Sequence, residues 1–129
     1  MAVASDSAYL FGGWNAYANA VQATTIAIPL STGIPSVITT SNNPPPRRQY
    51  QATGYGANVY VCGGYTDAAM SSPCGLLHVL DTETGAWTEL TGCPGGKTPV
   101  RGGMAANNGV LYVNAGADML AYVIASDTW

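Results

Sequence analysis

Residues 58–67 read NVYVCGGYTD, a strand-like run that stops at two glycines. Valines alternate with Tyr60 and Cys62, which is the period-two pattern of a half-buried β-strand. Glycine weakens the interior of a strand, so the pair Gly63-Gly64 predicts a tight exit or the close approach of another backbone segment.

The same pattern occurs three times along the chain. The copies read AYLFGG at 8–13, VYVCGG at 59–64 and LYVNAG at 111–116, and their tyrosines stand 51 and 52 residues apart. The middle copy is followed by LLHVLDTETGAW (76–87), in which a strand and a polar turn lead to Trp87. An arginine precedes a small-residue strand ahead of the second and third copies, in PPRRQYQATGYG (45–56) and PVRGGMAANNG (99–109). A sequence unit of about 50 residues therefore repeats across the chain.

This order of elements resembles the kelch repeat. The outer copies depart from the pattern, because Pro35 stands in the tryptophan register and Ala115 replaces the first glycine. The resemblance implies an all-β fold of kelch-type β-propeller blades, each a four-stranded antiparallel meander, in a partial propeller of about three blades. It also implies that the glycine pair lets neighbouring blades approach one another, and that Trp87 packs on its own blade and the next.

The repeat places the strands and divides the chain. We expect blade one at about 1–43, with strands near 1–5, 7–13, 23–30 and 35–40. Blade two is expected at about 44–98, with strands near 48–55, 58–64, 76–81 and 86–91. Blade three, at about 99–129, has strands near 102–107, 109–115 and 119–125 and reaches Trp129 where its outer strand should begin.

Composition excludes several classes of protein. The 129 residues are 47% hydrophobic and only 9% charged, with a net charge of −3. Four basic residues cannot neutralise a run of phosphates, which argues against nucleic-acid binding. No apolar stretch approaches the roughly 20 residues of a membrane span, and no signal peptide is visible.

Residues for catalysis are scarce. His78 is the only histidine, and we interpret it as a half-buried strand residue opposite Glu89 rather than as a catalytic base. A zinc site made of His78 with Cys62, Cys74 and Cys93 lacks any C-x-x-C spacing. The sequence therefore predicts no enzyme, no catalytic residues, no cofactor and no metal.

The cysteines suggest a disulfide. The turn Thr82–Gly85 closes a hairpin in which facing residue numbers sum to 167, which places Cys74 opposite Cys93. Facing strand residues lie close enough for a disulfide after small adjustment. The alternative is two reduced thiols in adjacent loops, and the cellular compartment decides between them. This pair slightly favours an extracellular or other oxidising location.

Loops offer the best binding surface. In an antiparallel meander the loop after strand two and the link after strand four emerge on one face, and kelch domains that bind peptides commonly use this face. Arg47 and Arg101 have an equally plausible structural role between blades. The matching residues, which we expect to bind a partner, are Trp14, Asn15, Tyr17, Arg47, Arg48, Tyr65, Asp67, Arg101 and Asp118.

Two functions remain open at this point. The first is a non-enzymatic scaffold that binds a protein partner, or further copies of itself, through blade edges and loops. The second is a carbohydrate-binding module of an extracellular kelch protein, favoured by low charge and by aromatic loops that could stack on a sugar. Because fewer than three full blades cannot close a propeller, we expect the chain to live in an assembly or to be an excerpt of a longer kelch protein.

Overall fold

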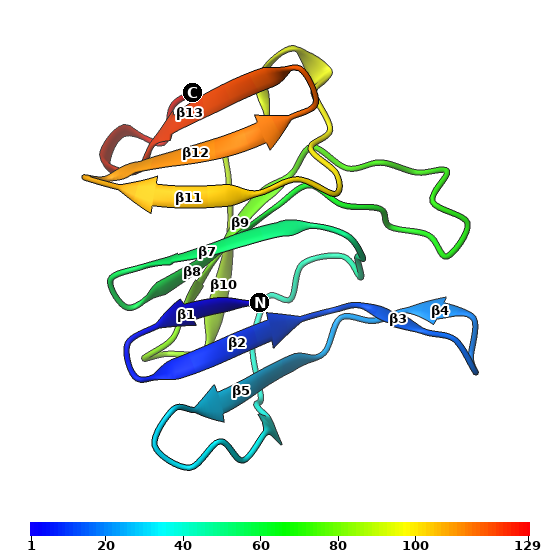
Figure 1. Cartoon of the computed structure of the whole chain (residues 1–129), viewed down its shortest axis with the longest axis vertical. Helices are drawn as coiled ribbons and strands as arrows, with labels where there is room; N and C mark the ends of the chain where they lie inside the picture. The colour runs from blue at the N-terminus through cyan, green and yellow to red at the C-terminus, as the bar shows by residue number, and fades with distance from the viewer.

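The computed structural model describes residues 1–129 as three stacked antiparallel sheets and a small hairpin (Figure 1). The first blade orders β1 (Ala2–Ala4), β2 (Ser7–Phe11), β5 (Thr25–Pro29) and β6 (Ser36–Val37). The second blade orders β7 (Gln51–Tyr55), β8 (Asn58–Cys62), β9 (Leu77–Asp81) and β10 (Ala86–Leu90). The third has β11 (Met104–Asn107), β12 (Val110–Ala115) and β13 (Asp118–Val123). The fold is all-β and forms part of a propeller, as predicted.

Each repeat-derived strand contains an observed one or overlaps it closely. One feature was not predicted: β3 (Trp14–Asn15) and β4 (Ala20–Val21) pair into a hairpin that extends the loop after β2. Two short 3₁₀ turns, η1 (Pro94–Gly96) and η2 (Ile124–Ser126), are the helical elements. Neither has the length or apolar character that a membrane-crossing helix requires.

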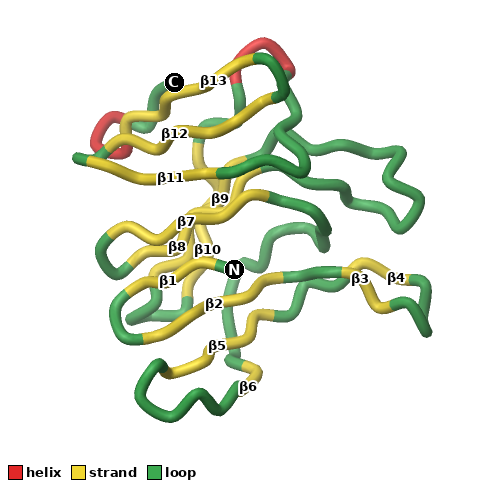
Figure 2. Tube along the Cα trace, viewed as in Figure 1, coloured by secondary structure: helices red, strands yellow, loops and turns green.

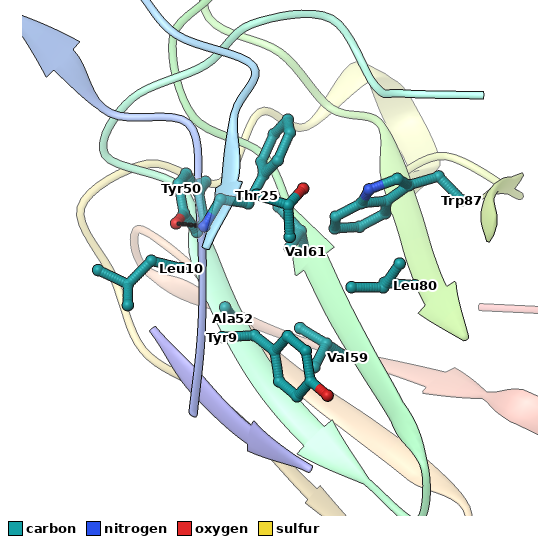
Figure 3. A pocket seen from close by; sticks show the side chains of 10 residues that line it. Tyr9, Leu10, Thr25, Tyr50, Ala52, Val59, Val61, Leu80 and Trp87 are labelled. Atoms are coloured by element: carbon teal, nitrogen blue, oxygen red, sulfur yellow. Dashed lines mark hydrogen bonds between the residues drawn. The ribbon is translucent and has the colours of Figure 1, made fainter. Parts of the chain in front are cut away.

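Trp87 stands at the centre of the packing between the first two blades. Its side chain is 1% exposed, and its ring centroid lies 5.0 Å from that of Phe11 in β2. Figure 3 shows Trp87 and Leu80 beside Val59 and Val61, with Tyr9 and Tyr50 closing the cluster, and no water-sized space remains among them. The expectation that Trp87 packs on the next blade was wrong: the ring faces the preceding one, because the valine face of β8 is turned toward β2.

The opposite face of the second blade packs on the third. Tyr60 and Leu77 lie against Leu111, Val113 and Tyr122, all of them buried. Trp129 completes this cluster: its ring centroid lies 5.2 Å from that of Tyr122, and its Nε1 donates to the Thr91 carbonyl oxygen at 2.7 Å. The period-two pattern of β8 therefore supplies one apolar face to each neighbouring blade.

The glycine pairs mark places where the link to the following blade touches the strand end. Gly63 has a positive φ of 72°, and a Cβ there would lie 1.8 Å from the Pro99 carbonyl oxygen. Gly64 donates its backbone N–H to the same oxygen at 2.8 Å. In the first blade Gly13 donates to the Arg47 carbonyl oxygen at 2.9 Å, so the contact repeats. Close backbone approach, expected from the sequence, is confirmed.

Candidate binding surface

The long loops project from one end of the blades. Figure 1 shows the β3–β4 hairpin and the loop between β8 and β9 extending toward the same side, and the β12–β13 turn lies at that end too. Figure 2 shows that these projections are mostly loop, apart from the β3–β4 pair. We call this end of the molecule the loop side. The hairpin turn between β7 and β8 lies at the opposite end.

An arginine–aromatic stack joins the first two blades on the loop side. The Arg48 guanidinium carbon lies 4.5 Å from the centroid of the Trp14 ring, which is 46% exposed. Arg48 Nη1 donates to the Ala68 carbonyl oxygen at 3.1 Å. Its Nε is buried with no hydrogen-bond partner in the protein. Arg48 therefore bridges the loop of the first blade and the loop of the second.

A second stack repeats this arrangement one blade later. The Arg101 guanidinium carbon lies 5.8 Å from the Tyr65 ring centroid. Arg101 Nε donates to Gln49 Oε1 at 2.7 Å, and Nη2 approaches Met70 Sδ at 3.1 Å. Tyr65 also exchanges backbone hydrogen bonds with Arg48, so the two stacks are linked directly. Sequence reasoning named these four residues separately but did not pair them, because each pair joins segments more than 30 residues apart.

Three other predicted residues hold the loops in shape. Asn15 Oδ1 accepts the backbone N–H groups of Tyr17 and Ala18 at 3.0 and 3.1 Å. The Asp67 carboxylate accepts hydrogen bonds from the Ser71 side chain and from nearby backbone N–H groups, which lowers its pKa. Asp118 pairs with Lys97 at 2.5 Å. Tyr17, at the tip of the β3–β4 hairpin, is fully exposed.

Arg47 cannot belong to a binding surface, because its side chain is completely buried. Its Nη1 approaches the carbonyl oxygens of Gly63 and Leu76 at 3.4 Å, and Nη2 lies 3.3 Å from His78 Nδ1. Burial lowers the pKa of the guanidinium, which still remains a donor only. The expectation that Arg47 contacts a partner was wrong, and the alternative of a structural role between blades is the one observed: Arg47 connects the link after the first blade to the second blade.

This contact also assigns the state of His78. Because arginine only donates, His78 Nδ1 must accept, which leaves the proton on Nε2, 3.5 Å from Glu89 Oε2. Burial and the charge of Arg47 lower the pKa of His78 to about 4, so the ring is neutral at neutral pH. His78 does face Glu89, as predicted, and is more deeply buried than expected. Arg47 therefore occupies Nδ1, and Nε2 lies beside Glu89.

The predicted pairing of Cys74 with Cys93 is wrong in its geometry. The expected register holds from Asp81–Ala86 to Leu77–Leu90. Beyond it, the Cys93 N–H donates to the Gly75 carbonyl oxygen at 2.8 Å, so the strands have slipped by one residue. A one-residue slip turns a side chain to the other face. Cys93 Sγ therefore lies 3.5 Å from Cys62 Sγ, and all three cysteines are free thiols.

Comparison with known proteins agrees with this architecture. Residues 46–94 match the family model of the Kelch motif, and this segment carries the whole second blade with its glycine pair and Trp87. The chain contains a kelch repeat. No curated protein matches it. One backbone contact of the second blade also occurs in the first: Gly13 donates to the Arg47 carbonyl oxygen at 2.9 Å, as Gly64 does to that of Pro99 at 2.8 Å.

Proposed function

We propose that this kelch-repeat chain is a non-enzymatic scaffold that binds a protein partner through its loop side. The kelch motif in general indicates a protein-interaction module. The one histidine is buried and neutral, with Nδ1 hydrogen-bonded to Arg47 and Nε2 3.5 Å from Glu89, which leaves it poorly placed for acid–base chemistry.

The observation that carries the proposal is the pair of arginine–aromatic stacks in equivalent positions on adjacent blades. Arginine and large aromatic residues are enriched where protein partners bind, because they bury much area at small entropic cost. Trp14 and Arg101 are exposed, and their partners Arg48 and Tyr65 are held by the backbone hydrogen bonds between them. Tyr17 extends the aromatic surface outward. The stacks are thus preorganised before any partner arrives.

A carbohydrate ligand is the alternative, and the same stacks weigh against it. A sugar binds an aromatic side chain through the face of its ring. The Arg48 guanidinium already covers one face of Trp14, and Arg101 lies over Tyr65. Binding of this chain to a glycan array, lost in Trp14→Ala, would favour the carbohydrate function over the protein-binding one.

Affinity capture with matched tyrosine variants tests the protein-binding proposal. Tyr65 lies on the loop side, whereas Tyr55 is exposed at the opposite end of the second blade, in the β7–β8 hairpin. Wild-type chain and both alanine variants are immobilised and exposed to extract of the cells that produce the protein. We expect Tyr65→Ala to lose a specific bound protein that wild type and Tyr55→Ala retain. Equal capture by all three would contradict the proposal.

We also propose a second function, self-association through the outer blade faces, because both open faces are apolar. On the first blade Val3 and Val37 are 52% and 70% exposed, on the face that carries Leu10, Ile26 and Ile28. On the third blade Tyr112, Met119 and Val123 are 40%, 65% and 41% exposed. Contiguous apolar patches of this kind mark interaction sites on proteins.

The repeat indicates how the two open faces match. The face of Tyr9 packs on the second blade and the face of Tyr60 on the third, whereas the equivalent face of Tyr112 is open. The sheet face that carries Leu10 in the first blade is exposed. The equivalent faces, which carry Val61 in the second blade and Val113 in the third, each pack against the blade that precedes them in the chain. Placing the third blade of one copy on the first blade of another therefore reproduces the internal contact, and two copies would supply six blades.

Light scattering tests self-association. We expect a particle at a multiple of the 13.2 kDa chain mass. Met119→Glu, on the open third-blade face, should reduce the particle mass to that of the monomer, whereas Tyr55→Glu at the β7–β8 turn should leave the particle mass unchanged. A wild-type particle of 13.2 kDa that unfolds cooperatively would refute self-association and leave the loop-side proposal intact.

A further inference from the structure

Two cysteine sulfurs meet at the end of the second strand of the second blade. Cys62 is the last residue of β8 and is completely buried. Cys93 follows β10 in the segment that links the second blade to the third, and it is partly exposed. Their Sγ atoms are 3.5 Å apart. A disulfide bond is about 2.05 Å long, so the two sulfurs need to close by about 1.5 Å.

The backbone around both residues is anchored. Cys93 donates its N–H to the Gly75 carbonyl oxygen at 2.8 Å, and Gly63 donates to the Leu76 carbonyl oxygen at 3.1 Å. The third cysteine, Cys74, is engaged differently, because its sulfur accepts the Leu76 N–H at 3.4 Å. The fold therefore holds the Cys62 and Cys93 sulfurs toward each other, whereas the Cys74 sulfur bonds to the backbone and provides an internal control.

The Cys62 and Cys93 thiols differ in the direction of their pKa shifts and in their exposure to solvent. The hydrogen bond with Cys62 lowers the pKa of Cys93, and Cys93 is also the one that solvent reaches. The same hydrogen bond and burial raise the pKa of Cys62. A thiolate, not a thiol, attacks a disulfide, so Cys93 is the residue that reacts first with an outside reagent.

We propose that Cys62 and Cys93 form a reversible intramolecular disulfide by exchange with a small oxidised disulfide such as glutathione disulfide. The Cys93 thiolate attacks one sulfur of glutathione disulfide, forms a mixed disulfide and releases one glutathione thiolate. That thiolate takes the Cys62 proton. The Cys62 sulfur then attacks Cys93 Sγ and releases the second glutathione thiolate, which is protonated by solvent. Two protein thiols are oxidised, and one glutathione disulfide is reduced to two glutathiones.

The bond would act on the link between blades. Residues 92–101 lead from β10 to the loop side, where the Pro99 carbonyl oxygen meets Gly64 and Lys97 pairs with Asp118. A covalent connection from Cys93 to β8 clamps the start of this link to the second blade. The oxidised protein should therefore resist thermal unfolding better than the reduced protein, and dithiothreitol should reverse the gain.

Peptide mapping of the oxidised protein identifies the pair. The chain is incubated with glutathione disulfide, its remaining thiols are alkylated, and it is cut at acidic residues. Asp67, Glu83 and Glu89 separate the three cysteines, so each lies on its own peptide. We expect a mass loss of about 2 Da and a cross-linked peptide pair that contains Cys62 and Cys93. A Cys74–Cys93 cross-link, or three alkylated thiols at high glutathione disulfide, would overturn the proposal.

Cysteine variants separate the two steps. Cys74→Ser should still form the disulfide, whereas Cys93→Ser should leave Cys62 as an unreacted thiol. Cys62→Ser should stop at the mixed disulfide, with one glutathione on Cys93, because the sulfur that lies 3.5 Å from Cys93 Sγ has been removed. If Cys62→Ser does not fold, the order of reaction is read from wild type: a short exposure to glutathione disulfide should trap the adduct on Cys93, and an adduct on Cys62 would contradict the order.

Discussion

Trp87→Ala should remove much of the packing between the first two blades. The side chain is 1% exposed and fills a space with no room for water among the apolar residues of β2, β8 and β9. Truncating a buried tryptophan to alanine costs about 3–5 kcal/mol of unfolding free energy, because the cavity closes only in part. We therefore expect a loss in this range.

Trp87→Phe should cost much less. The indole Nε1 is buried with no hydrogen-bond partner in the protein. An unsatisfied buried donor carries a penalty of about 1–3 kcal/mol, and phenylalanine removes it while leaving a smaller cavity. We expect a net loss below about 2 kcal/mol.

A double-mutant cycle with Phe11 assigns the effect to the contact between blades. The two rings are 5.0 Å apart and tilted by 56°, a geometry in which aromatic pairs contribute about 0.5–1.5 kcal/mol beyond their buried area. Urea unfolding followed by circular dichroism supplies the free energies. Trp14→Ala is the matched control, since that ring is 46% exposed, and it should cost about 1 kcal/mol or less. A Trp87→Ala loss below about 1 kcal/mol, or no coupling to Phe11, would refute the reasoning.

Three further changes test other contacts. The pKa of His78 is about 4 in the folded protein and 6.5 in the unfolded chain, so the unfolded state binds the proton first as pH falls. Urea titrations should show the unfolding free energy of wild type falling by about 2 kcal/mol between pH 7 and pH 5, and that of His78→Gln changing little. Gly63→Ala should destabilise the fold by several kcal/mol, because its Cβ would strike the Pro99 carbonyl oxygen, whereas Gly56→Ala, at a similar positive φ of 61° with open space around it, should cost about 1 kcal/mol. Equal shifts in the thermal unfolding midpoint of the two variants would contradict this. Tyr122→Phe removes a hydrogen bond of 2.5 Å to Asp127 Oδ1 and should cost about 1–2 kcal/mol by urea unfolding; an unchanged midpoint would show that the bond contributes nothing.

Much of the fold was predictable because its determinants are local. Alternation of apolar residues sets which side chains share a face, and the turn at Thr82–Gly85 sets the register of β9 with β10. Both depend on residues next to one another in the chain. The β3–β4 hairpin escaped prediction because its strands have only two residues each, too few to show a period.

The candidate site was predicted only in part. Trp14, Tyr65, Arg48 and Arg101 were named from the repeat, but their stacking depends on segments of two blades meeting. Arg47 was misplaced because adjacent arginines look alike in sequence, and only the packed link shows that one points inward. The cysteine pairing failed because a one-residue slip after Leu90 is invisible to a count of facing residues.

That this chain builds kelch-type blades follows from its amino-acid order alone, since repeated glycines, tyrosines and turns encode backbone geometry residue by residue. What each chemically distinctive side chain contacts depends instead on how the blades pack. Arg47 became a buried tie, His78 a neutral hydrogen-bonded residue, and Cys93 the neighbour of Cys62. These outcomes depend on desolvation and on contacts between segments far apart in the chain, and both arise only when the blades pack together.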